Sequence, residues 1–217
     1  MAIKALLLDL GNVLTKFGLR TLVFERIVLR FGGNPALVAT LFGNEPGEAR
    51  YWQLDTGKMS HEELYRRIVV GTGIRAGALP YERFCALYVT HLQLIESMLP
   101  IVRKLQDRFK LVVVSNGDFG SRYVVDRLET DHGIEFAESF VSSEIGVKKP
   151  GMLAVVKGVM WQSHQIAPHE CLFIDDIPEY AKAAEDLGMK AFVHNATIET
   201  TPGIFEAKLH DHDIFLT

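Results

Sequence analysis

The chain has 217 residues, a formal net charge of −4, 48% hydrophobic residues and 23% charged residues. This composition is typical of a globular protein with a sizeable core, and the lack of a basic cluster argues against nucleic acids and membrane surfaces as partners. Two isolated cysteines, the lack of a signal-peptide pattern and the lack of an apolar run of transmembrane length predict a cytoplasmic protein.

The first predicted strand lies in an apolar run that begins at Ile3 and leads to the acidic residue Asp9. A run that is apolar on both faces indicates a strand covered on both sides, as in a parallel sheet. Gly11 follows and allows a sharp turn or a close approach of a ligand to the backbone. Open α/β sheets bind their ligands at the carboxyl ends of their strands, so Asp9 is a candidate functional residue.

Residues 16–95 have a different pattern, with apolar residues at helical spacing and no strand-like run. Ser60 followed by Glu63 predicts a capping box at the start of one helix, and Pro80 predicts the start of another. We therefore expect an all-helical insert directly after the first strand.

Strand and helix patterns alternate in the rest of the chain. Apolar runs predict strands at 111–114, 136–141, 171–174 and 191–193. Helical spacing predicts helices at 101–107, 123–128, 153–160, 178–187 and 205–209. This alternation is typical of a parallel sheet with helices on both faces. The predicted fold class is α/β, with a Rossmann-like core formed by residues 1–15 and 96–217 and a helical insert at 16–95.

Polar residues follow the carboxyl ends of several predicted strands, where a parallel sheet would bring them to one edge. They are Asp9, Ser115 with Asn116, Asp175 with Asp176, and Lys149 in a loop. Carboxylate oxygens suit Mg²⁺, whereas a hydroxyl and an ammonium group suit phosphate or another tetrahedral anion. A carboxylate such as Asp9 could act as a nucleophile and form an aspartyl-phosphate.

Four motifs in this order resemble those of the haloacid dehalogenase-like (HAD) hydrolase superfamily and together span the predicted core. They are Leu8-Asp9-Leu10-Gly11-Asn12-Val13-Leu14, Val114-Ser115-Asn116, Lys149-Pro150 after Gly146, and Phe173-Ile174-Asp175-Asp176. The insert resembles the small helical cap of the C1 type. The Asp-Leu-Gly-Asn-Val run resembles a subset that includes sugar 1-phosphate phosphatases.

The resemblance implies a role for each matching position. Asp9 would be the nucleophile and a Mg²⁺ ligand, and the other ligands would be the main-chain carbonyl of Gly11 and the side chains of Asp175 and Asp176. Ser115, Asn116 and Gly117 would bind or support the phosphoryl group. Lys149 would neutralise charge there, with Lys148 as the adjacent alternative. The implied protein is a Mg²⁺-dependent phosphoric monoester hydrolase that acts on a small phosphorylated substrate, such as a sugar phosphate.

Two positions depart from the pattern of the superfamily. Many of its phosphatases carry a second aspartate, the general acid, two residues after the nucleophile, where this chain has Gly11. General acid catalysis commonly contributes about 10²–10⁴-fold, so good leaving groups are expected to be preferred. Many members also place Asp or Asn four residues after the position of Asp176; this chain has Tyr180 there, and the neighbouring Glu179 could substitute through a water.

Two other functions remain open at this stage. A 2-haloacid dehalogenase would also use Asp9 on carbon and would need no Mg²⁺, but clustered carboxylates without a metal repel one another. A non-catalytic protein with the same fold would use the cleft or the cap to bind a ligand or a partner. Arg50, Tyr51 and Trp52 could face a substrate or belong to the core and surface of the insert, and we expect His210 to Asp213 to be a solvated end.

Overall fold

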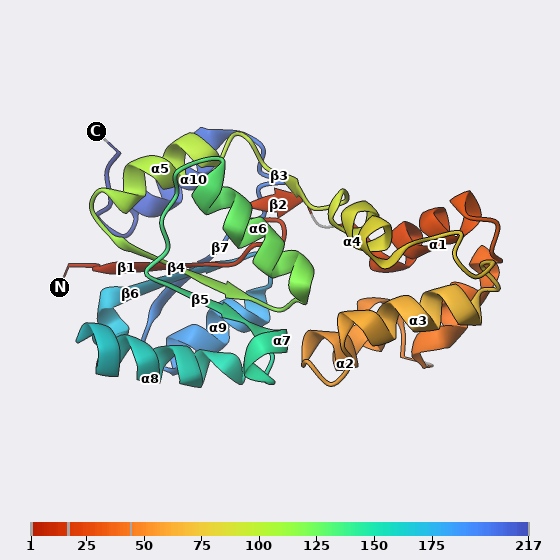
Figure 1. Ribbon diagram of the computed structural model, residues 1–217. Coiled ribbons are helices and arrows are strands. Elements are labelled where there is room, and N and C mark those ends of the chain that lie inside the picture. Colours follow the sequence, from red (N-terminus) through yellow and green to blue (C-terminus); the bar gives the residue numbers. More distant parts are fainter. Residues whose placement is uncertain (1, 17, 44, 217) are drawn as a thin grey trace.

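A five-stranded parallel sheet forms the centre of the molecule (Figure 1). The computed structural model describes residues 2–16, 18–43 and 45–216. The strands lie in the order β5-β4-β1-β6-β7 and are β1 (Ala5–Leu8), β4 (Lys110–Ser115), β5 (Glu138–Val141), β6 (Cys171–Asp175) and β7 (Lys190–Val193). In the central strand, Leu8 pairs with Val113 on one side and Ile174 on the other. The predicted α/β fold class is confirmed.

Helices cover both faces of this sheet. Side chains alternate between the faces along each strand, and the apolar side chains on both faces are buried by these helices. Leu6 and Leu8 of β1 pack beneath α5 (Leu99–Gln106), α6 (Phe119–Thr130) and α10 (Pro202–His210). Ala5 and Leu7 pack against α8 (Met152–His164) and α9 (Pro178–Asp186). Burial on both faces explains why the strands are apolar at nearly every position.

The segment between β1 and β4 carries an aromatic core of its own. Its helical elements are α1 (Arg20–Arg30), the 3-10 helices η1 (Pro35–Phe42) and η2 (Gly47–Tyr51), α2 (Trp52–Asp55), α3 (His61–Gly71) and α4 (Tyr81–Val89). The ring of Phe24 stacks on Phe84 and Tyr88 at centroid distances of 6.2 and 5.3 Å. We propose this segment, 16–95, as a separate domain on the strength of its own core.

A short antiparallel ribbon joins the two ends of the insert to the sheet. It consists of β2 (Thr15–Lys16) and β3 (Gln93–Leu94), and Thr15 pairs with Leu94. The outgoing and returning chain therefore leave the core side by side, and Figure 1 shows both at the same end of the sheet.

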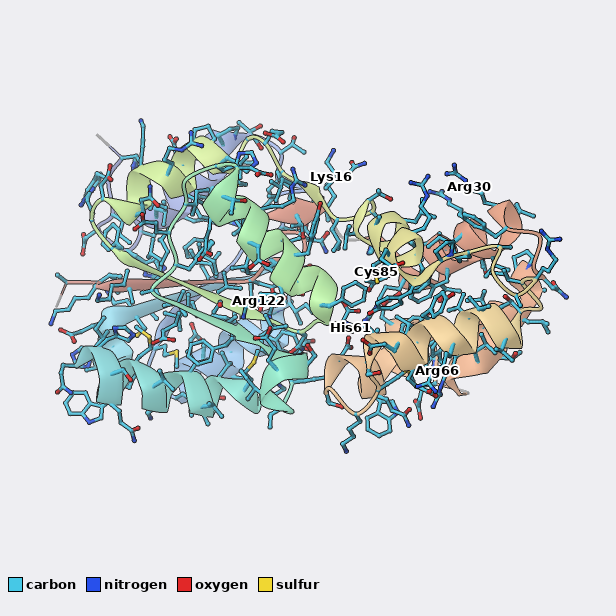
Figure 2. All side chains as sticks on the ribbon, viewed as in Figure 1. Lys16, Arg30, His61, Arg66, Cys85 and Arg122 are labelled. Atoms are coloured by element: carbon cyan, nitrogen blue, oxygen red, sulfur yellow. The ribbon has the colours of Figure 1, made fainter. Side chains whose placement is uncertain are left out.

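The insert also touches the core far from this ribbon, where α2 meets α7 (Ser142–Ile145). The Ser142 hydroxyl donates to the carbonyl oxygen of Asp55 at 2.6 Å. Gly57 adopts a left-handed backbone with φ of +68°, and a Cβ there would lie 2.2 Å from the carbonyl oxygen of Ser143. Figure 2 shows His61 and Arg122 at the same junction between insert and core.

The elements differ from the sequence expectations mainly at their ends. Asp118 caps α6 by accepting from the Gly120 N–H at 2.8 Å, so this helix begins four residues before the expected Tyr123. At α3, Ser60 accepts from the Glu63 N–H as expected of a capping box, but the Glu63 carboxylate pairs with Arg67. The turns that form η1, η2, α2 and α7, and the 3-10 helix η3 (Pro168–Glu170), were not expected. The expectation of an all-helical insert is wrong at its two ends, where β2 and β3 pair because each is too short to show a strand pattern in the sequence.

Two further properties concern the chain as a whole. Cys85 and Cys171 are both free thiols. None of the described helices is long and apolar enough to cross a membrane.

Candidate active site

The carboxyl ends of the strands face the insert across a cavity of about 230 Å³. Its lining includes seven of the eight site residues expected from the sequence: Asp9, Gly11, Ser115, Asn116, Gly117, Lys149 and Asp176. Asp175, the eighth, is fully buried directly beneath. The sheet thus brings together residues that are up to 167 positions apart in the sequence.

Lys149 links two of the buried carboxylates. Its ammonium lies 2.8 Å from Oδ1 of Asp9 and 2.6 Å from Oδ2 of Asp175. Burial would lower the pKa of Lys149, but Asp9 and Asp175 raise it above its usual value, so the ammonium stays charged. Lys148 turns away and pairs with Asp55 at 2.8 Å. Of the two adjacent lysines, Lys149 is the one beside Asp9.

The environment of Asp9 shifts its carboxyl group toward the protonated form when no metal is bound. Burial raises the pKa of Asp9 to about 7, Lys149 lowers it, and the nearby carboxylates of Asp175 and Asp176 raise it further. Such a group needs a compensating cation to ionise fully at neutral pH.

Three carboxylates could together bind such a cation. Asp9, Asp175 and Asp176 can each place one oxygen within 4.8 Å of the others. A set of oxygen ligands with open space beside it fits Mg²⁺, which keeps several waters. Asp175 already accepts from Lys149 and, through Oδ1, from the Ile177 N–H at 2.9 Å. The half-buried Asp176 faces the cavity and accepts from Asn12 Nδ2 at 2.8 Å.

Ser115 and its neighbours lie at the end of β4. The buried Ser115 hydroxyl is 3.3 Å from that of Ser121. The Asn116 side chain accepts from the Lys149 N–H at 2.7 Å and donates to the Tyr180 hydroxyl at 3.3 Å. The Gly117 N–H donates to the Ser142 hydroxyl at 3.0 Å, so this N–H is engaged within the protein.

The turn after Asp9 supplies no acid. Gly11 lines the cavity, and Asn12 has a left-handed backbone with φ of 55°. The Asn12 N–H donates to the carbonyl oxygen of Thr15 at 2.7 Å, which closes the turn before the insert begins. Glu179 is exposed and lies outside the cavity lining, whereas Tyr180 lines it. The hypothesis that Glu179 substitutes in the metal site therefore gains no support from its position.

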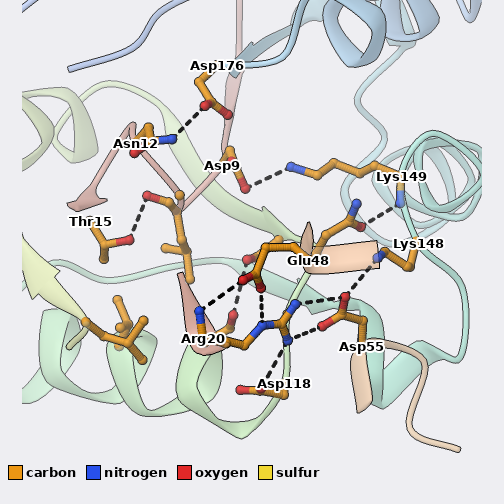
Figure 3. Close-up of a pocket in the computed structure, with 18 of the residues that line it drawn as sticks. Asp9, Asn12, Thr15, Arg20, Glu48, Asp55, Asp118, Lys148, Lys149 and Asp176 are labelled. Carbon is orange, nitrogen blue, oxygen red and sulfur yellow. Dashed lines mark hydrogen bonds and ion pairs between the residues drawn. The ribbon is translucent and has the colours of Figure 1, made fainter. Parts of the chain in front are cut away.

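The insert contributes a charged cluster to the cavity that the sequence did not predict (Figure 3). Arg20 is buried and donates to Glu48 at 2.6 Å and to Asp55 at 2.5 Å. It also reaches Asp118 at 3.4 Å, and that carboxylate accepts from the Tyr88 hydroxyl at 2.6 Å. Burial would raise the pKa of Asp55, but Arg20 and then Lys148 lower it below its usual value.

The sequence carries only a weak signal for this cluster. Asp118 directly follows the Ser115-Asn116-Gly117 turn, where a helix cap and a site residue are both plausible. Arg20, Glu48 and Asp55 look like ordinary surface charges of amphipathic helices.

The other candidates of the insert and the tail lie elsewhere. Tyr51 is buried in the insert core and Trp52 is exposed. Arg50 donates to the carbonyl oxygens of Gly47 and Ala39. None of the three lines the cavity. Among the described residues, the carboxylate triad is the only cluster of potential metal ligands found, and it excludes the tail from His210 to Asp213.

The chain is similar to known proteins in its sequence and in its fold. A family model described as a haloacid dehalogenase-like hydrolase matches residues 3–188. A comparison with curated protein sequences gave no match.

Several solved structures share the fold at low sequence identity. The HAD family enzyme bt-2542 from Bacteroides thetaiotaomicron, solved in complex with magnesium and inorganic phosphate, is 22% identical; the alignment covers 88% of this chain and 94% of that one, with a TM-score of 0.68. A predicted HAD-like family hydrolase from Porphyromonas gingivalis is 20% identical over 96% and 98% of the two chains, with a TM-score of 0.68. A 2-haloacid dehalogenase from Pseudomonas syringae pv. Tomato DC3000 is 19% identical over 90% and 87%, with a TM-score of 0.57.

Proposed function

The chain belongs to the haloacid dehalogenase-like hydrolase family, and on that premise we propose that it is a Mg²⁺-dependent phosphatase of small phosphomonoesters. The observation that carries the proposal is the position of Asp9. This carboxylate is held 2.8 Å from the Lys149 ammonium, beside two further carboxylates, at the floor of a cavity.

The carboxylate cluster favours a phosphatase over a dehalogenase. Three carboxylates within 4.8 Å of one another, facing a single ammonium, form a costly arrangement unless a cation joins them. A reaction on carbon has no use for such a cation, whereas a phosphoryl group does. The magnesium and phosphate in the complex of bt-2542 support the same choice.

In the proposed reaction, a carboxylate oxygen of Asp9 attacks the phosphorus of the substrate. The bond between phosphorus and the ester oxygen breaks, and the leaving oxygen takes a proton from water. Water then attacks the phosphorus of the aspartyl-phosphate, which releases inorganic phosphate and restores Asp9. Lys149 would offset the charge on Asp9 and the phosphoryl oxygens, and the Ser115 hydroxyl would donate to one of those oxygens.

Mg²⁺ bound at this site would draw electron density from the phosphoryl group and offset its charge against that of Asp9. We propose Asp9, the carbonyl of Gly11 and the cavity-facing Asp176 as its main ligands. Asp175 is proposed as a secondary ligand, because both of its oxygens already accept hydrogen bonds within the protein.

The substrate is proposed to carry one phosphate on a neutral, hydroxyl-rich group such as a sugar. Each Lys or Arg in the cavity lining is already paired with a carboxylate: Arg20 with Glu48 and Asp55, Lys148 with Asp55, and Lys149 with Asp9. Burial lowers the pKa of His91, the remaining basic side chain of the lining, so it adds no cation at neutral pH. A second anionic group would therefore meet no unpaired cation among the described residues.

The absence of an acid at Gly11 favours substrates whose leaving oxygen needs little protonation. An anomeric sugar oxygen and an acyl phosphate are examples. We therefore propose sugar 1-phosphates ahead of sugar 6-phosphates.

Phosphate release tests the proposal directly. Wild type, Asp9→Asn and the exposed control Asp107→Asn are assayed with sugar 1-phosphates, sugar 6-phosphates, acyl phosphates and a nitrophenyl ester, with Mg²⁺ and with EDTA. We expect turnover by wild type and Asp107→Asn with Mg²⁺, and a loss of at least about 10³-fold in Asp9→Asn because the nucleophile is absent.

Two results would contradict the proposal. Unchanged phosphatase activity in Asp9→Asn would exclude the mechanism. Chloride release from 2-chloropropionate in EDTA, without any phosphate release, would establish the dehalogenase instead.

A further inference from the structure

Tyr180 lines the same cavity from the first turn of α9, and the proposed reaction assigns it no role. The resemblance leads one to expect Asp or Asn at this position, so the phenol is a departure from that pattern. The side chain is half-buried, and its ring faces the Lys149 ammonium at 5.3 Å from the ring centroid.

The hydrogen bonds around Asn116 make the Tyr180 hydroxyl the acceptor in its contact with Asn116. A backbone N–H can only donate, so the Lys149 N–H, 2.7 Å away, requires the amide oxygen of Asn116 to face it. The amide NH₂ of Asn116 must then face Tyr180 and donate to the phenol oxygen at 3.3 Å. The phenol oxygen is an acceptor in this contact, which leaves its own proton for another partner.

That proton meets no acceptor among the described residues. Burial raises the pKa of Tyr180, so the phenol stays protonated at neutral pH. The Tyr180 hydroxyl accepts from Asn116. The free space beside it is the cavity that Asp9, Ser115 and Lys149 also line. A donor of this kind beside an ammonium suits an anion that contacts both groups.

We propose that the Tyr180 hydroxyl donates a hydrogen bond to the phosphoryl group at Asp9, and that Asn116 is the positioning residue that orients both this hydroxyl and the backbone of Lys149. This assignment rests on the proposed phosphatase function. It adds a third side-chain donor, after Ser115 and Lys149, to the group that holds the tetrahedral anion.

The test measures the binding of inorganic phosphate by calorimetry at saturating Mg²⁺, together with inhibition by phosphate and the Mg²⁺ concentration for half-maximal activity. The variants are wild type, Tyr180→Phe, and Tyr123→Phe as a control on an exposed tyrosine of α6 outside this cavity. Tyr180→Phe keeps the ring over Lys149 and removes only the hydroxyl.

A hydrogen bond to a charged group predicts that Tyr180→Phe weakens phosphate binding by about 10- to 100-fold. We expect the Mg²⁺ requirement and the melting temperature to stay at wild-type values, and Tyr123→Phe to behave as wild type. A second comparison tests the positioning role of Asn116. If Asn116 orients the Tyr180 hydroxyl, Tyr180→Phe should weaken phosphate binding less in the Asn116→Ala background than in wild type.

The failures are distinguishable. If wild type binds phosphate and Tyr180→Phe binds it within about twofold, the assignment to Tyr180 is wrong while the phosphatase stands. If the losses in Tyr180→Phe and Asn116→Ala simply add, Asn116 does not orient the hydroxyl and that part of the assignment is wrong. If wild type neither hydrolyses phosphoesters nor binds phosphate, both the proposed function and this assignment are wrong.

Discussion

At the scale of single residues, Asp9 lies in a group of carboxylates whose negative charge a bound cation would balance. Asp9 is buried next to two other carboxylates, and the one ammonium of Lys149 is shared between Asp9 and Asp175. This explains why the pKa of Asp9 is raised even though a lysine lies in contact with it. Metal and proton should therefore compete for the same carboxylate.

This competition predicts a pH dependence with a defined sign. Asp9 binds its proton below about pH 7 in the folded, metal-free protein, and below about pH 4 when unfolded. Metal-free stability should therefore rise as the pH falls through about 7, and the Mg²⁺ concentration for half-maximal activity should rise as well. Thermal unfolding and Mg²⁺ titrations from pH 5.5 to 8.5 measure both.

The control for this prediction is Asp9→Asn, which lacks the titrating group. Its metal-free stability should lose this part of the pH dependence. A Mg²⁺ requirement that is equal at pH 6 and pH 8 would show that Asp9 is already ionised without metal.

At the scale of elements, the contact between α2 and α7 sets how closely the insert approaches the sheet. Gly57 combines a left-handed backbone with a close approach to the carbonyl oxygen of Ser143. The same region holds Asp55, which pairs with Arg20 and Lys148 above the cavity. A side chain at position 57 should therefore disturb the cavity through the placement of the insert.

The substitution Gly57→Ala tests this link against Gly77→Ala. Both glycines have φ between 65° and 80°, but a Cβ at Gly77 meets nothing within 4 Å. Each variant should lose about 1 kcal/mol of unfolding free energy from the strained backbone. Only Gly57→Ala should also lower kcat/KM, by about 10-fold or more, because backbone at Ser143 must move. Equal kinetics in both variants would show that this contact does not position the insert.

The sequence predicted the core elements and their polar strand ends because both depend on local rules. Asp9, Ser115 and Asp176 each follow a short apolar strand, and parallel pairing then brings them together. No comparable rule covers Arg20 and Glu48, whose helical elements present charges on faces that look solvent-exposed until the core is placed against them. Tyr180 was visible as a departure, but its hydrogen-bond direction depends on Asn116 and Lys149, which are distant in sequence.

The whole molecule combines a floor of clustered carboxylates, supplied by the sheet, with a roof supplied by the insert, in which Arg20 is paired with Glu48 and Asp55. The roof has no unpaired cation among the described residues, so it should discriminate against substrates with a second anion. Glucose 1-phosphate and glucuronic acid 1-phosphate differ by one carboxylate and little in size. We expect kcat/KM for the second to be lower by at least about 10-fold, because its carboxylate would be desolvated without a partner.

Steady-state kinetics with both substrates measure this difference. Glu48→Gln removes a negative charge from the cavity, so the difference in kcat/KM between the two substrates should become smaller. The control Glu82→Gln, at an exposed position, should leave this difference unchanged. Equal kcat/KM values for both substrates in wild type would contradict the charge argument.

The ribbon of β2 and β3 has a consequence for how such proteins diversify. Since the chain leaves and re-enters the core through two paired strands, the length and sequence between them can change without altering the register of β1 against β4 and β6. Recombination or drift can then replace the insert between β2 and β3 while the residues at the strand ends stay the same. The ancestral chemistry and the choice of substrate would thus be inherited as separable traits, joined at Thr15 and Leu94.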